Sequence, residues 1–412
     1  MPMSDRPHLL FVDDDPKVIS GIRRNLHPYK KEWKLSFAGS GQEALELIKS
    51  EKVDLLVSDI RMPGMTGQEL FDHVQRISPQ TIRMALSGIM EVDNVVETMG
   101  NAHRFMSKPC SPEKLTHEIE EALAAREDHP SPDTQKLATR LGSLPVLPEV
   151  YQRIEDELSA KEPSMHRMAD IVSQDPGLVA AVLKLTNSPF FGLRRTITSI
   201  FQAINLLGME TVKALIVSQH IFWGQSRKNP PFSIKLLWEH SFRVSNMARL
   251  IAQCEQMDRN AMAQCRIGGI LHDIGKLILA DSFDSKYEAV VQQSGKGTPI
   301  HEKEKELFNV NHAQIGMYVM DLWGMDPEIA KAIGHHHDTL RPDISLSLII
   351  AVADHFDHAW INFTNDYTGA MISEPLYDTL RDSGDLERWE THILDNWPEI
   401  REIGGFKEGN GE

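Results

Sequence analysis

Acidic and basic residues follow the ends of short apolar runs in the first third of the chain. Asp13 and Asp14 follow the run LLFV, and Asp59 ends VDLLVSD. Lys108 follows HRFMS. A carboxylate that accepts a phosphoryl group needs a divalent cation to neutralise the incoming oxygens and a cationic side chain to hold the product. These residue types therefore predict phosphoryl transfer to an aspartate, if the fold brings them together.

Histidines and aspartates recur in the second half of the chain in an order that suits a metal centre. They are His240 in LWEHS, His272 and Asp273 in GILHDIGKL, His312 in NHAQIG, His336 in the HHH run and Asp354 in AVADHFD. Imidazoles and carboxylates in this combination suit Mn²⁺, Fe or another first-row metal. The open alternative is a metal-free core in which a buried histidine bonds an aspartate and fixes helix packing.

The strands and helices that must position the strand-end residues Asp13, Asp14, Asp59 and Lys108 lie between residues 8 and 126. Five short apolar runs, from LLFV to HRFMS, are each followed by an amphipathic stretch. Parallel strands need crossover helices, so this alternation predicts an α/β doubly wound, five-stranded parallel sheet. Ligands of such sheets bind outside the carboxyl ends of the strands, where the acidic residues stand.

The rest of the chain is predicted to be all-α. The stretch EDHPSPDTQK lacks hydrophobic periodicity and reads as a linker, whereas later segments such as MADIVSQDPGLVAAVLKLTN keep helical spacing. The segment SRKNPPF interrupts that spacing. The predicted parts are an α/β domain at 1–126, a linker at 127–140, a smaller helical part at 141–225 and a larger helical part at 226–412.

The composition of the chain limits the kinds of molecule that it is expected to bind and the compartment in which it is expected to lie. The formal net charge of -16 over 412 residues, without a Lys/Arg-rich stripe, argues against direct DNA binding. No uninterrupted apolar run reaches the roughly 18 residues of a membrane span, so no membrane insertion is expected. Three cysteines without CxxC spacing indicate a reducing compartment, and the predicted localisation is cytoplasmic.

The strand-end residues, together with Ser87 in ALSG and Phe105 in HRFMSKP, resemble the receiver domain of bacterial response regulators over residues 8 to about 126. The resemblance implies that Asp59 is the phosphoacceptor and that a sensor histidine kinase is the phosphate source. It also implies a cis peptide bond between Lys108 and Pro109.

The same resemblance assigns roles to the remaining strand-end residues. Mg²⁺ would be held by Asp14, Asp59 and the backbone carbonyl of Arg61, with Asp13 as acidic support. Ser87 and Lys108 would contact the phosphoryl group. Phe105 would turn inward with Ser87 as the switch that reshapes the surface around the fourth helix.

The second region, through the motifs LGSLPVLPEV, QDPGLVAAVLKLTNSPFFG, LWEHS and GGILHDIGKLIL, resembles the HDOD family of signal-output domains over roughly residues 137 to 360. That family is related to metal-dependent HD phosphohydrolases, which implies an all-α, HD-superfamily-like helical domain. In the related HD-GYP class, which hydrolyses cyclic di-GMP, the lysine equivalent to Lys276 meets phosphate. The DGxGYP loop of that class is replaced here by DTLRPDISL.

Two functions follow from these resemblances. The first is a two-component response regulator whose phosphorylation on Asp59 controls an HDOD domain that binds a downstream signalling protein. The alternative is a metal-dependent phosphohydrolase acting on a cyclic dinucleotide or nucleotide. An interaction module should tolerate His272→Ala with Asp273→Ala, whereas an enzyme should lose function. Whether the chain forms a homodimer stays open.

Overall fold

The chain forms two compact units. Unit 1 contains Met1–Ala169, Ala180–Gln225 and Asp321–Met325, and unit 2 contains Asp170–Val179, Ser226–Met320 and Asp326–Glu412. The computed structural model describes residues 6–88, 92–128, 135, 137, 139, 144–193, 195–224, 230–283, 285–294, 298–338, 343–361 and 372–403.

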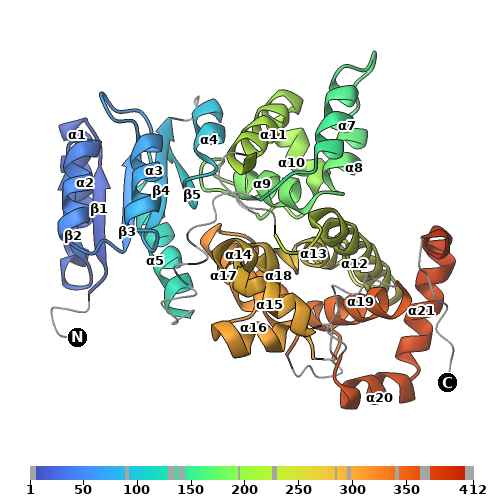
Figure 1. The fold of residues 1–412 in the computed structure, drawn as a ribbon. Helices are drawn as coiled ribbons and strands as arrows, with labels where there is room; N and C mark the ends of the chain where they lie inside the picture. Colours follow the sequence, from blue (N-terminus) through green and yellow to red (C-terminus); the bar gives the residue numbers. More distant parts are fainter. Residues whose placement is uncertain are drawn as a thin grey trace. The chain divides into compact units, whose positions relative to one another are not determined.

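A five-stranded parallel sheet forms the first part of unit 1, as predicted (Figure 1). Its strand order is β2-β1-β3-β4-β5. The strands are β1 (His8–Val12), β2 (Lys34–Ala38), β3 (Leu55–Asp59), β4 (Ile82–Gly88) and β5 (Arg104–Lys108). The flanking helices are α1 (Pro16–Asn25), η1 (His27–Lys31), α2 (Gly41–Ser50), α3 (Gly67–Ile77), α4 (Val92–Thr98) and α5 (Pro112–Asp128).

The sequence dictates this layout through burial and capping. Every residue of β1 is buried, and so are the first four of β3, as expected for parallel strands covered on both faces. Helix α3 starts directly after the β3 edge because Thr66 and Glu69 form a reciprocal capping box. Gly67 allows the close approach, since a Cβ there would overlap the backbone carbonyl of Asp59.

Helices continue the chain after the sheet domain. They are α7 (Pro148–Leu158), α8 (Met165–Val172), α9 (Pro176–Thr186), α10 (Ile200–Leu207) and α11 (Met209–Gly224). Asp175 caps α9 by accepting a hydrogen bond from the backbone N–H of Leu178 at 2.9 Å. Within unit 1, α11 packs against α4.

Unit 2 is entirely helical in the residues described. Its main elements are α12 (Ile234–Cys254), α13 (Arg259–Leu271), α14 (Ile274–Phe283), α15 (Ser285–Ser294), α16 (Ile300–Phe308), α17 (His312–Leu322), α18 (Pro327–His335), α19 (Leu346–Trp360), α20 (Glu374–Asp382), α21 (Asp385–Asn396) and η2 (Pro398–Glu402). Ser233, Asp258 and Ser345 cap the helices α12, α13 and α19.

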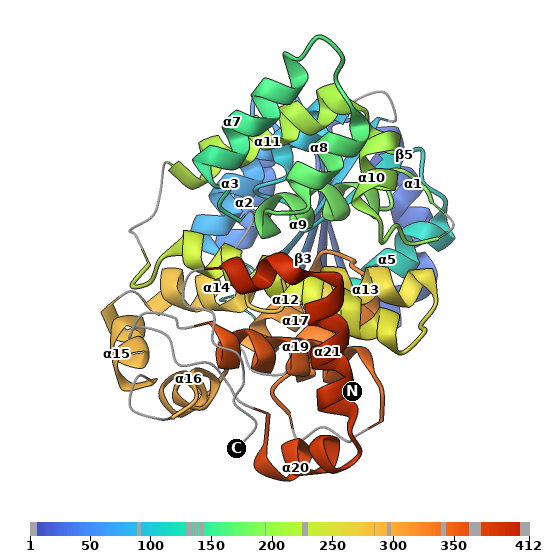
Figure 2. The same cartoon turned by 90° about the vertical axis from the view of Figure 1, so that its right-hand side faces the viewer.

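The core of unit 2 lies where α12, α13 and α19 meet (Figure 2). Val244 and Met247 of α12 pack there with Ile349 of α19, all fully buried. The closing helices α20 and α21 add Leu380 and Trp389 to the same cluster. Of the histidines and aspartates singled out above, His240 lies on α12 and Asp354 on α19, and His272 directly follows the last residue of α13.

Parts of the predicted boundaries lie outside the described residues. These are most of the linker 127–140, positions 226–229 of the helical break, and residues 339–342 where the DGxGYP loop would stand. Among the described helices, none alone is long and apolar enough to cross a bilayer. The helices Ile200–Leu207 and Met209–Val217 pass this test of length and composition only when they are taken together, and the chain bends by 100° between them.

Candidate functional sites

The first site lies at the carboxyl edge of the sheet. The Lys108 ammonium, at the end of β5, lies 2.7 Å from Asp13 Oδ2 beyond β1 and 2.7 Å from Asp59 Oδ2 at the end of β3. The parallel register brings these strand ends to one edge, as the sequence predicted. The lysine thus holds the place where a phosphoryl oxygen would need a cation.

The acidic side chains of this edge fit a hard divalent cation. Ligand oxygens of Asp13, Asp14 and Asp59 lie within 4.8 Å of one another, and Asp14 is exposed. Carboxylate oxygens with room for water are the ligands that Mg²⁺ prefers. The backbone N–H of Arg61 donates to Asp59 Oδ1 at 3.4 Å, which brings the Arg61 backbone to the same place.

The charges at this edge shift its pKa values in opposing ways. Burial raises the pKa of Asp59, and the neighbouring Asp13 carboxylate adds to this, while Lys108 opposes it. Burial would lower the pKa of Lys108, but hydrogen bonds to the two carboxylates outweigh burial and raise it. The site is therefore short of positive charge until a divalent cation arrives.

The predicted switch residues lie on the strands β4 and β5. Ser87 follows Leu86, the register partner of Asp59, and it is 1% exposed. Phe105 on β5 is also buried. The Lys108–Pro109 peptide bond is cis, as expected. Asp13, Asp14, Asp59 and Lys108 therefore meet at one edge of the sheet, whereas Phe105 lies near the start of β5. The roles of all these residues remain predictions.

The second site lies inside the helices of unit 2. His240 projects from α12, His272 and Asp273 occupy the junction of α13 and α14, and Asp354 lies on α19. His240 Nε2 is 3.2 Å from His272 Nε2, 3.5 Å from Asp273 Oδ2 and 3.2 Å from Asp354 Oδ1. Atoms that bind one ion at about 2.0–2.2 Å lie roughly 3–3.5 Å apart. The four side chains thus have the spacing of ligands around one metal.

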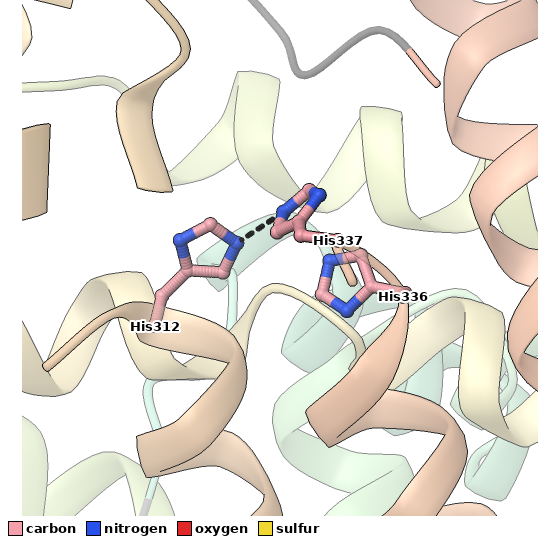
Figure 3. A group of neighbouring side chains, drawn as sticks. All are labelled: His312, His336 and His337. Carbon is pink, nitrogen blue, oxygen red and sulfur yellow. Dashed lines mark hydrogen bonds between the residues drawn. The ribbon is translucent and has the colours of Figure 1, made fainter. Parts of the chain in front are cut away.

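A second group of imidazoles adjoins this one. Figure 3 shows His312 from the start of α17 facing His336 and His337, which follow α18. His312 Nε2 lies 2.9 Å from His337 Nε2 and 3.3 Å from Asp273 Oδ1. Because Asp273 also faces His240, it is placed to bridge two metal positions.

The tautomers of four imidazoles are fixed by oxygen acceptors behind them. In each ring Nδ1 donates to a carboxylate or backbone carbonyl: His240 to Asp357 at 2.7 Å, His272 to Gly269 O at 2.8 Å, His312 to Glu304 at 2.6 Å and His336 to Ile333 O at 2.6 Å. A neutral ring that donates from Nδ1 presents a lone pair at Nε2. This arrangement of outer partners is typical of metal-binding histidines.

These lone pairs need a cation. Two Nε2 atoms that each present a lone pair, those of His240 and His272, are only 3.2 Å apart. His336 Nε2 is buried and, within the part of the chain described, has no hydrogen-bond partner. A buried acceptor left unpaired costs about 1–3 kcal/mol. A metal ion would satisfy these atoms, so the residues present fit one.

Electrostatics lead to the same conclusion. Burial lowers the pKa of His240, but hydrogen bonds to the carboxylates of Asp273, Asp354 and Asp357 outweigh burial and raise that pKa to about 10. The three carboxylates around this ring therefore favour a positive charge at this place, which a metal ion would supply.

Lys276 lies inside this cluster. Its Nζ is 2.5 Å from Asp273 Oδ2, and the residue is 3% exposed. The predicted phosphate contact would therefore be made from a lysine that already neutralises the carboxylate of Asp273, a predicted metal ligand. That role remains a prediction.

Gly275, between Asp273 and the rest of α14, lets two helices approach closely. A Cβ at this position would overlap the backbone carbonyl of His312. We expect Gly275→Ala to separate α14 from α17, to cost about 1–3 kcal/mol of unfolding free energy and to weaken metal binding by His312. Urea unfolding and Co²⁺ titration measure both effects. Gly21→Ala is the control because its Cβ would meet nothing within 4 Å, and equal behaviour of the two variants would contradict the packing argument.

The structure adds residues to the cluster that the sequence analysis did not include among the predicted metal ligands. His337 and His358 face the cluster, and Asp357 and Glu304 hold its histidines from behind. The HHH run and the ADHFDH motif contained signals for His337, Asp357 and His358. Glu304 lies in the charged stretch HEKEKELF, where nothing in the sequence distinguishes it from a surface residue.

Comparisons with known proteins match a known family to each of two parts of the chain. The family described as response regulator receiver domain matches residues 9–120, and the HDOD domain family matches residues 144–339. Over 125 residues the chain is 36% identical to the transcriptional regulatory protein GlrR of Escherichia coli (strain K12), covering 29% of this chain and 27% of that protein. Over 234 residues it is 25% identical to an uncharacterized protein of Treponema pallidum (strain Nichols), covering 56% of this chain and 45% of that one.

The chain thus spans less than half the length of these two curated relatives. Among solved structures, the MmoQ response regulator of Methylococcus capsulatus str. Bath is 22% identical with a TM-score of 0.44, covering 60% of this chain and 97% of that one. An HDOD domain protein of unknown function from Geobacter sulfurreducens is 23% identical with a TM-score of 0.38, covering 69% and 96%. The chain combines a response regulator receiver domain with an HDOD domain.

Proposed function

We propose that a sensor histidine kinase phosphorylates Asp59 with the help of Mg²⁺, and that this controls the HDOD domain, which acts by binding a downstream signalling protein. The observation that carries the first step is the Lys108 ammonium held between Asp13 and Asp59, beside the exposed Asp14. Phosphoryl transfer depends on positioning and on charge neutralisation, and this edge offers both.

Loading the full chain with acetyl phosphate tests the first step. In Mg²⁺, intact-protein mass spectrometry should detect one added phosphoryl group, and chelation of Mg²⁺ should prevent its addition. Unmodified protein under both conditions would contradict the proposal. The variant that locates the phosphoryl group is treated in the Discussion.

Contacts within unit 1 suggest how the signal leaves the receiver. The Lys184 ammonium of α9 is buried and donates to the carbonyls of Met99 and Ala102, just after α4, at 2.9 and 2.8 Å. It also lies 5.8 Å from the ring centroid of Phe105. Cationic groups at a helix C-terminus stabilise the last carbonyls. We infer that a shift of Phe105 and α4 would change the hydrogen bonds that Lys184 donates to the carbonyls after α4.

Burial makes this contact costly. It lowers the pKa of Lys184 far below the usual value, and the charge of Arg83 adds to the effect. A buried ammonium that is held mainly by carbonyls is sensitive to small movements of those carbonyls. A second cation, Arg104 of β5, donates to the carbonyls of Asp321 and Leu322 at 2.9 and 3.2 Å. Leu322 is the last residue of α17, whose first residue is His312.

Lys184→Met should uncouple the receiver from the helices that follow it. Methionine keeps the length and apolar stem of lysine but cannot donate to the two carbonyls. In the wild-type chain, loading Asp59 with beryllofluoride should change hydrogen exchange in α10 and α11. In Lys184→Met this change should be lost.

The control for this variant is Lys213→Met, which removes an exposed lysine from α11. It should retain the wild-type response. An undiminished response in Lys184→Met, with beryllofluoride bound, would contradict the route through Lys184.

A second candidate function is a metal-dependent phosphohydrolase of HD type acting on a cyclic dinucleotide or nucleotide. The observation that favours it is the set of four imidazoles whose Nδ1–H groups are anchored, so that their Nε2 atoms converge near Asp273 and Asp354. A bound Mn²⁺ or Fe pair would supply an activated water there. The residues of the chain would hold the ions, orient them and keep the site dry.

A hydrolysis assay separates the two functions. Full-length protein loaded with Mn²⁺ or Fe²⁺ should convert cyclic di-GMP only if the second candidate is correct, and His272→Ala with Asp273→Ala should abolish that turnover. If the double variant still binds the same signalling partner and turnover is absent, the interaction module stands alone. Loss of partner binding in a folded double variant would contradict a metal-independent module.

A further inference from the structure

His358 is a histidine of the cluster that has no place in the ligand set expected from the sequence. It lies on α19, four residues after Asp354, so the two side chains project from the same face one helical turn apart. His358 Nε2 is 3.2 Å from Asp354 Oδ1, and its side chain is 5% exposed. This separation is that of two ligands sharing one ion.

The partners of His358 are the residues of the first metal position. Ligand atoms of His358, Asp354 and His240 lie within 4.8 Å of one another. The ring centroids of His358 and His240 are 4.8 Å apart. His240 Nδ1 donates to Asp357, so only the Nε2 of this ring is placed to bind an ion. An ion on His240 and Asp354 is therefore also within reach of His358.

We propose that His358 is a further ligand of the first metal position, an inference that rests on the proposed metal centre. In this proposal His358 shares an ion with His240 and Asp354, the two residues whose ligand atoms lie within 4.8 Å of its own. The second position keeps His312, His336 and His337, with Asp273 shared between the two.

This ligand set determines which metal the first position takes and what it does. Imidazole nitrogens together with carboxylate oxygens suit Fe or Zn, whereas Mg²⁺ prefers oxygen ligands and water. A further protein ligand would leave fewer positions on the ion open to water, and catalytic sites depend on open positions.

Metal titration of the full chain with His358→Ala tests the proposal. The control is His355→Ala, which removes a buried imidazole from the same helix. The ring of His355 lies against Phe356 and Tyr377, and among the described residues it belongs to none of the groups of closely spaced ligand atoms. Apo protein is titrated with Co²⁺, and the visible spectrum and X-ray absorption report the number of imidazoles per ion.

Wild type and His355→Ala should bind Co²⁺ equally. His358→Ala should bind it about 10- to 100-fold more weakly at the first position, with one imidazole fewer on that ion. An unchanged affinity and imidazole count in His358→Ala would overturn the role of His358. If wild-type protein takes up no Co²⁺ at all, the metal centre itself fails, which is a distinct result. Circular dichroism confirms that each variant is folded.

Discussion

Asp59→Asn should abolish phosphoryl uptake from acetyl phosphate. The asparagine amide cannot form the acyl phosphate, and it no longer offers Mg²⁺ a charged oxygen. The substitution should also remove one of the two carboxylates that bind Lys108. In the wild-type chain the Lys108 ammonium lies 2.7 Å from each of them. Intact-protein mass spectrometry after exposure to acetyl phosphate and Mg²⁺ measures the result.

Asp15→Asn is the matched control. Asp15 follows Asp13 and Asp14 in the sequence but is exposed and caps α1, so its substitution leaves the cluster intact. It should take up the phosphoryl group as wild type does. Phosphorylation that persists in Asp59→Asn, or that disappears equally in Asp15→Asn, would contradict Asp59 as the acceptor.

Asp273→Asn should remove both metal ions from the HDOD domain. Asp273 faces His240 at 3.5 Å and His312 at 3.3 Å, so its carboxylate serves both positions. Substitution of a residue that hydrogen-bonds to a metal ligand already weakens metal binding by about 10–100-fold. The loss of a ligand shared by two ions should weaken it by at least the upper value. Asparagine keeps an acceptor for Lys276, which limits the damage to the fold. Elemental analysis after Fe²⁺ or Mn²⁺ loading and desalting measures the loss.

Asp338→Asn serves as the control because Asp338 is an exposed carboxylate that bonds His335, next to the His336–His337 pair. It should retain the wild-type metal content. A folded Asp273→Asn protein with an undiminished metal content would show that the two positions do not share this carboxylate.

The receiver site could be predicted almost completely from the sequence, for a physical reason. Parallel strands place their carboxyl ends at one edge, so Asp13, Asp59 and Lys108 had to meet once the five strands were recognised. Ser87 followed from its place after the fourth strand. In contrast, the contacts of Lys184 with the carbonyls after α4 join residues more than 80 positions apart, and helical periodicity alone does not indicate them.

The helical site could be predicted only in its innermost ligands. His272 and Asp273 are adjacent in the sequence, so the HD motif itself indicates that they lie together. Asp354 and His358 in ADHFDH are four residues apart, which places them on one face of a helix. The oxygen acceptors behind the rings depend on how distant helices pack. Glu304 is fully buried against His312 although its segment is rich in charge, and His272 is oriented by the backbone carbonyl of Gly269. Every residue has a backbone carbonyl, so the amino-acid sequence does not show which carbonyl will accept a hydrogen bond from a histidine.

The most direct test of the account is the metal content of the purified full chain. Protein prepared without chelators and reconstituted anaerobically with Fe²⁺ or Mn²⁺ should retain close to two ions per chain after desalting, one for each position around Asp273. Protein that retains no transition metal, while its circular dichroism shows an intact helical fold, would contradict the metal centre. It would leave a phosphorylation-controlled binding module.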